Sequence, residues 1–85
     1  MGEERRQAER RRMLRRGRIV FRKGHGVIDC VVLDISSGGA RLRAPAALMI
    51  PDRFQLRIDD GSSYEVAVCH RGEGIAGVRF LDRAA

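Results

Sequence analysis

The sequence has little of what defines several common protein classes. Its 85 residues include only two cysteines, two prolines, one tyrosine and no tryptophan. Two isolated cysteines, Cys30 and Cys69, cannot form the disulfide framework that stabilises many small secreted domains. These two cysteines and the two histidines, His25 and His70, are dispersed along the chain, whereas a zinc site needs closely spaced ligands. We therefore expect no bound metal and a reducing environment.

Long hydrophobic runs are also missing. No apolar segment approaches the roughly 18 residues of a transmembrane helix, and none follows the charged start of the chain as it would in a secretory signal. A cytoplasmic protein without a membrane partner is expected. At 33% charged and 44% hydrophobic residues, the composition is that of one small folded domain.

Positive charge is concentrated at the start of the sequence. Residues 1–23 hold ten of the 17 basic residues and three of the 11 acidic residues, a net charge of +7, so the remainder is close to −1. Residues 1–17 are too polar to fold alone and are expected to form a basic, flexible N-terminal segment. Residues 1–16 of it could form either a solvated helix or a mobile tail. An anionic partner should meet this segment.

From Arg18 onward the pattern is that of an all-β domain. Short β-prone or alternating runs are separated by glycine-rich turns, which predicts a six-stranded antiparallel β-barrel over residues 18–85. The expected strands cover residues 18–21, 27–35, 40–44, 54–58, 64–71 and 75–80. In the third of these strands, Arg41 and Arg43 should face away from the core. Leu48, Met49 and Ile50, in a connection bracketed by prolines, are expected to plug an open end of the barrel.

A motif for ligand contact ends the long second strand. Asp34 and Ser36 have the same strand parity, so both side chains should emerge on one side of the barrel, and Gly39 lets the backbone turn away. A carboxylate beside a hydroxyl suits the N–H donors of a guanine edge. Read alone, the same residues could form only a turn that ends the strand.

The arginine cluster before the first strand offers cationic hydrogen-bond donors, whereas Asp34 offers anionic acceptors. Guanidinium groups bond bidentately to phosphate oxygens and to the O6 and N7 edge of guanine. Arg11 and Arg15 stand four residues apart, and Arg10 precedes them. Arg12 and Arg16 have the same spacing, which leaves an alternative register for the pair.

Together, these motifs resemble those of the PilZ domain family of cyclic di-GMP receptors. The resemblance rests on R-x-x-x-R at residues 11–15, D-x-S-x-x-G at residues 34–39 and the closing strand GIAGVRF, so it covers nearly the whole chain. The doublet formed by Arg10 and Arg11 is also typical of the family and favours the 11–15 register. The resemblance implies that the arginines bind guanine edges and phosphates, that Asp34 and Ser36 contact guanine, and that Gly39 shapes the loop.

The function implied is that of a bacterial receptor for the second messenger cyclic di-GMP, with no other cofactor. Closure of the N-terminal segment on the ligand would pass the signal to a downstream effector protein. No nucleophile and base pair or P-loop is visible, so we expect no enzymatic activity. Two alternatives are a basic barrel that binds nucleic acid, disfavoured because aromatic residues make up only 5% of the chain, and a PilZ-like adaptor that binds no ligand.

Overall fold

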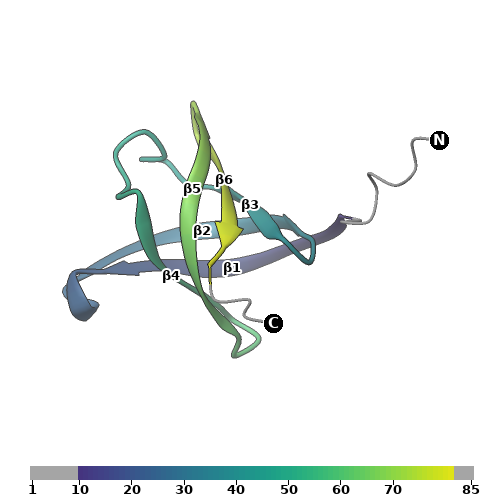
Figure 1. The fold of residues 1–85 in the computed structure, drawn as a ribbon, viewed down its shortest axis with the longest axis horizontal. Helices are drawn as coiled ribbons and strands as arrows, with labels where there is room; N and C mark the ends of the chain where they lie inside the picture. The colour runs from purple at the N-terminus through teal and green to yellow at the C-terminus, as the bar shows by residue number, and fades with distance from the viewer. Residues whose placement is uncertain (1–9, 82–85) are drawn as a thin grey trace.

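Alternating apolar residues build six strands around one interior in the computed structural model, which describes residues 10–81. The strands are β1 Arg11–Phe21, β2 Gly26–Ile35, β3 Gly39–Arg43, β4 Arg53–Ile58, β5 Ser63–Gly72 and β6 Ile75–Phe80. All neighbouring strands are antiparallel. The all-β antiparallel barrel expected from the sequence is confirmed (Figure 1).

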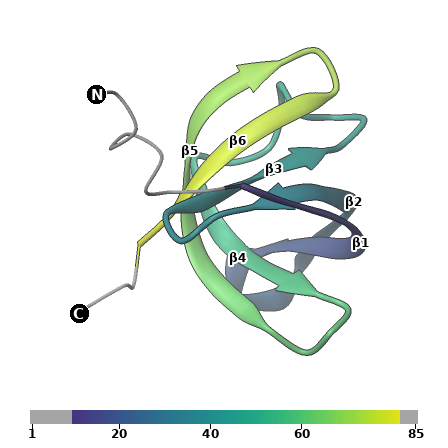
Figure 2. The same cartoon turned by 90° about the vertical axis from the view of Figure 1, so that its right-hand side faces the viewer.

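The strand order around the barrel is β1-β2-β3-β6-β5-β4, and pairing of β1 with β4 closes it. This closing contact is short, because only residues 17–20 of β1 pair with residues 55–58 of β4. Residues 11–16 of β1 extend beyond β4 and pair with β2 alone. The first part of β1 is therefore an arm that projects with the end of β2, and Figure 2 shows its start beside the turn between β2 and β3.

The core is filled by the inward side of each strand. Its five largest fully buried side chains are Ile19, Val32, Leu42, Leu56 and Val66. They come from five different strands, so the hydrophobic interior itself holds the ring of strands together. The only helical turn within residues 10–81 is η2 Arg22–Gly24, between β1 and β2, and no helix in this range could span a bilayer.

The first strand begins at Arg11, not at Arg18 as the sequence pattern predicted. Residues 11–17 belong to the basic segment predicted from the sequence, because they are polar and hold too little apolar surface to fold alone. Most of these side chains are exposed, and backbone pairing with β2 holds them in the sheet. Hydrophobic periodicity does not reveal a strand that buries so little. Residues 1–9 of the expected flexible segment lie outside the described residues.

The connection between β3 and β4 also differs from the expectation. Ile50 is buried as predicted, but Leu48 is 62% and Met49 81% exposed. Arg71 of β5 fixes this connection: its Nη1 donates to the carbonyl oxygens of Ala47 and Ile50 at 3.2 and 2.7 Å. Its Nη2 also binds Asp52. Hydrogen bonding of the backbone therefore sets the shape of this connection and leaves two large apolar side chains in solvent.

Gly39 starts β3 where β6 passes very close. A Cβ atom at this position would overlap the carbonyl oxygen of Val78 and lie 3.0 Å from the Cα of Arg79. Both atoms belong to the backbone of a paired strand and cannot move aside without breaking the ladder. At Gly38, one residue earlier, a Cβ atom would project into open space, with no other atom within 4 Å.

We therefore predict that Gly39→Ala lowers the free energy of unfolding by about 1–3 kcal/mol, the usual cost of forcing atoms into a packed site. Gly38→Ala is the matched control and should change it by less than about 0.5 kcal/mol. Urea unfolding followed by circular dichroism measures both. Equal stabilities of the two variants would contradict the role assigned to Gly39.

Candidate functional site

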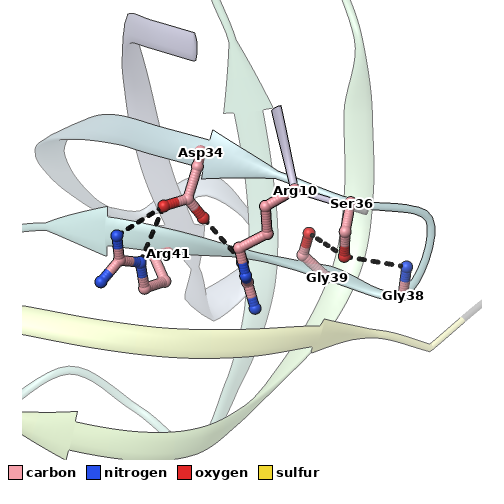
Figure 3. A network of polar contacts seen from close by, with 6 residues as sticks. All are labelled: Arg10, Asp34, Ser36, Gly38, Gly39 and Arg41. Atoms are coloured by element: carbon pink, nitrogen blue, oxygen red, sulfur yellow. Dashed lines mark hydrogen bonds and ion pairs between the residues drawn. The ribbon is translucent and has the colours of Figure 1, made fainter. Parts of the chain in front are cut away.

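Asp34 is the only buried charged residue among residues 10–81 and is 7% exposed. Two arginines bind its carboxylate. Arg10 Nη1 donates to Oδ1 at 2.6 Å, and Arg41 of β3 approaches Oδ2 with Nε at 2.8 Å and Nη2 at 2.7 Å (Figure 3). We call Arg10, Asp34 and Arg41 the Asp34 cluster. It joins the start of the β1 arm to the end of β2 and the middle of β3.

Two irregularities in the sheet aim these side chains at one another. Val32 pairs with Leu42, but Asp34 pairs with Arg41, so β2 has one extra residue at Leu33. Without this bulge, Asp34 would keep the inward parity of Val32. The bulge instead places it opposite Arg41, on the face where the arginine is exposed. Bulges are known to redirect side chains in this way next to functional sites.

The second irregularity lies in β1, again next to Asp34. Arg12 pairs with Asp34 and Arg15 with Val32, so three steps along β1 match two along β2. Leu14, within this bulge, has a φ of 50°, a left-handed conformation that is uncommon for a non-glycine residue. The bulge changes the direction of the arginine side chains along the arm.

Competing effects set the charge of Asp34. Burial would raise its pKa, because loss of water disfavours the ionised form. The hydrogen bonds from Arg41 and Arg10, with the attraction of their charges, outweigh burial and hold the pKa of Asp34 below its ordinary value. The same pairing raises the pKa of Arg41. The cluster therefore carries two positive charges and one negative charge at neutral pH.

Ser36 lies in the tight turn that follows β2. Its hydroxyl accepts a hydrogen bond from the backbone N–H of Gly38 at 3.3 Å and lies 3.4 Å from the carbonyl oxygen of Gly39, to which it donates. Its own backbone N–H donates to the same carbonyl oxygen at 2.8 Å. The two side-chain bonds are long, so they are weak. Figure 3 shows this turn beside Arg10 and Asp34.

The predicted arginines do not all lie at the Asp34 cluster. Arg10 binds Asp34, whereas Arg15 Nη1 binds Asp59 of the turn between β4 and β5 at 2.9 Å. Arg11 and Arg12 are exposed on the β1 arm, paired across from Ile35 and Asp34. The alternative residue Arg16 is exposed and pairs with Val31, further from the end of β2.

Sequence analysis did not identify Arg41 as part of the site. Its alternation with Leu42 correctly predicted an outward side chain. The same alternation along β2 gave no reason to place Asp34 opposite Arg41. Only the extra residue at Leu33 brings the two together. A basic residue two positions after the glycine of the motif was the one available signal.

The cysteines do not contribute to the site. Cys30 is buried in the core, and burial raises the pKa of its thiol to about 11, so it stays protonated and acts as a small apolar side chain. Cys69 is exposed and free. Among residues 10–81, no three His, Cys, Asp or Glu side chains lie close enough together to hold a metal ion.

Pairing in the Asp34 cluster predicts a specific loss of stability in acid. Because the folded pKa of Asp34 is below that of an unfolded aspartate, about 3.9, its contribution is complete above that value. The contribution disappears as the pH falls through the lower folded pKa. We expect Asp34→Asn to be less stable than the wild type at neutral pH, with the difference narrowing below about pH 4. Thermal unfolding across this pH range measures it, and a constant difference would contradict the pairing.

A comparison with protein families identifies a match. The model of the PilZ domain family matches residues 4–84, nearly the whole chain of 85 residues. No curated protein matches the sequence. PilZ domains form a family of ligand-binding receptors for cyclic di-GMP, not of enzymes, and their barrel architecture agrees with the six strands described above. By the extent of this match, and by its fold, the chain belongs to the PilZ domain family.

Proposed function

We propose that this protein is a cyclic di-GMP receptor whose binding residues are Arg10, Arg11, Arg15, Asp34 and Ser36, with Gly39 shaping the turn. The observation that carries the proposal is the Asp34 cluster. A buried carboxylate stands between two guanidinium groups at the point where the β1 arm meets the turn after β2. Such a cluster offers acceptors and cationic donors within one small volume.

The chemistry of the cluster matches that of a guanine nucleotide. The Asp34 carboxylate can accept hydrogen bonds from the N1–H and N2–H₂ groups of guanine. Guanidinium groups released from it can bind O6 and N7 or the phosphates. Arg10 and Arg41 are half-exposed, so their outer edges are accessible to a ligand without opening the core.

The remaining residues need only small rearrangements to take part. The Arg15–Asp59 pair has both side chains nearly half exposed, so solvent screens it and a phosphate can replace the aspartate. The weak bonds of the Ser36 hydroxyl are similarly easy to exchange. Arg11 is exposed on the same arm. In the alternative register, Arg12 and Arg16 would take the places of Arg11 and Arg15.

Signal transmission follows from the position of the arginines. They lie at the start of β1, so ligand bound to them holds the N-terminal segment against the end of the barrel. A downstream effector protein would then recognise the closed segment. Ordering of a charged segment by phosphate is an established kind of molecular switch. Such a receptor would act in the bacterial cytoplasm.

Calorimetric titration with cyclic di-GMP tests the site. We expect micromolar or tighter binding by the wild type and a loss of roughly tenfold to a hundredfold in Asp34→Ala and in Arg15→Ala, the usual effect of removing a charged hydrogen-bond partner. Asp29→Ala, which removes an exposed carboxylate from the same strand, and Arg53→Ala are the matched controls and should bind as the wild type does.

Full affinity in both Asp34→Ala and Arg15→Ala would exclude the proposed site. The same titration with duplex DNA at two salt concentrations tests the nucleic-acid alternative, because phosphate-driven binding weakens steeply with salt. Binding of DNA without binding of cyclic di-GMP would favour that alternative. Failure to bind either would favour a PilZ-like adaptor.

Limited digestion with trypsin tests the proposed closure. Saturating cyclic di-GMP should slow cleavage after Arg5 and Arg6, because the ligand ties the adjacent arginines to the barrel. Cleavage at Arg22 and Lys23, in the exposed turn at the opposite end of the β1–β2 hairpin, is the internal control and should not change. Mass spectrometry of the fragments measures both rates. Closure is refuted if the ligand binds and leaves the rate after Arg5 and Arg6 unaltered.

A further inference from the structure

A second cationic surface lies away from the Asp34 cluster. It is a groove of about 950 Å³ across β1 and β2, open to solvent along one side. The turn that carries Asp59 bounds it at one end, and Pro45 and Gly74 bound it at the other. None of Arg10, Asp34, Ser36, Gly39 or Arg41 lines it, whereas Arg16, which belongs to the alternative register of the nucleotide site, does. We call this surface the arginine groove.

The groove combines an apolar floor with positive walls. Its floor is lined by the nearly buried residues Gly17, Cys30 and Ile58 and by the half-buried Val31. The charged lining residues are Arg16, Arg18, Arg43, Arg57, Asp29 and Asp59. Four positive and two negative charges give the groove a formal charge of +2.

Most of this positive charge is not neutralised inside the protein. Asp59 already binds Arg15, which lies outside the lining. Arg57 donates to the neutral amide oxygen of Gln55, and Arg18 lies 3.7 Å from an Asp29 side chain that is 90% exposed. Within residues 10–81, no acidic side chain forms an ion pair with Arg16, Arg43 or Arg57.

We propose that the arginine groove docks an extended acidic segment of a partner protein, in which carboxylates alternate with apolar residues. In an extended chain, successive side chains point to opposite sides, so one row can meet the arginines while the other packs on the apolar floor. The charge of the groove selects an acidic segment. The groove is partly open to solvent, so it can accept a segment that belongs to a longer chain.

The lining also argues against a single-stranded nucleic acid as the occupant. Such ligands are usually held by aromatic side chains that stack on the bases. No aromatic residue lines the groove. The positive walls could attract any polyanion, but the floor provides a reason for apolar side chains between the charges. This distinction separates a peptide site from a general electrostatic surface.

The wall formed by Pro45 is held in place for such a role. It belongs to the connection between β3 and β4, whose carbonyl groups at Ala47 and Ile50 are bound by Arg71. The same connection exposes Leu48 and Met49. The hydrogen bonds from Arg71 hold the backbone of this connection in place, and a backbone that is already held loses less entropy on binding.

Fluorescence anisotropy with a synthetic peptide tests the proposal. The probe is a short fluorescein-labelled peptide in which glutamate alternates with leucine, and the comparison peptide has serine in place of each leucine. We expect the first to bind the full-length protein more tightly. The double variant R18E/R57E should weaken it by about tenfold or more, because like charges then face each other. Arg53→Glu, an exposed arginine of β4 outside the groove, is the matched control.

Three outcomes would overturn the proposal: no binding of the leucine-containing peptide, equal binding of both peptides, or equal weakening by R18E/R57E and Arg53→Glu. The last two would indicate only diffuse charge attraction. Circular dichroism confirms that the variants are folded.

Titration of R18E/R57E with cyclic di-GMP separates this proposal from the proposed receptor function. Unchanged nucleotide affinity supports two distinct sites, and a parallel loss assigns the groove to the nucleotide site instead. If the wild type binds the peptide and not cyclic di-GMP, the receptor function fails while the docking groove stands.

Discussion

The pairing of one buried carboxylate with two arginines is the interaction on which this end of the barrel depends. Asp34 is almost fully removed from water, and an unpaired charge in such a position would be strongly destabilising. Arg41 supplies one partner from the neighbouring strand and Arg10 supplies the other from the start of the β1 arm. Because the arm pairs with β2 alone and only its Met13 packs against the core, this ion pair helps to fix its end. Asp34 thus holds Arg10, the residue next to the arginine motif, at the end of β2.

The two bulges explain how a regular barrel makes room for this arrangement. A strand without irregularities alternates between core and solvent, and Asp34 would then occupy an inward position two residues after Val32. The extra residue in β2 moves the carboxylate to the arginine-bearing face, while Ile35 packs against the core opposite Ala40. The bulge around Leu14 makes the corresponding change in β1. The number of residues between the motif positions therefore does not give the face on which each side chain lies, because the bulges change that face.

Sequence patterns predicted most of the fold because a strand that buries one face has an apolar residue at every second position. The buried set Phe54, Leu56 and Ile58 could be identified in this way, and the turn and arginine motifs indicated the family. Three features escaped the same reasoning. The strand over residues 11–17 has no apolar period. The exposure of Leu48 and Met49 depends on hydrogen bonds from Arg71 to carbonyl groups 21 and 24 residues away. Arg41 reaches Asp34 only because of a bulge in β2. Each depends on contacts between segments, which periodicity within one segment cannot encode.

The arginines of this chain differ in whether the protein itself supplies their counter-ions. Arg10 and Arg41 share Asp34, and Arg15 pairs with Asp59. An anion that binds these arginines must therefore replace an aspartate of the protein, and its affinity depends on how well it fits the guanidinium groups that the aspartate releases. Arg16, Arg43 and Arg57 have no acidic partner within residues 10–81, so their field acts directly on approaching anions. Internal pairing reduces the repulsion among clustered arginines and raises specificity, whereas unpaired charge favours attraction and rapid encounter. The distribution of acidic residues, more than the number of arginines, therefore divides the arginines of this chain into a paired group and an unpaired group.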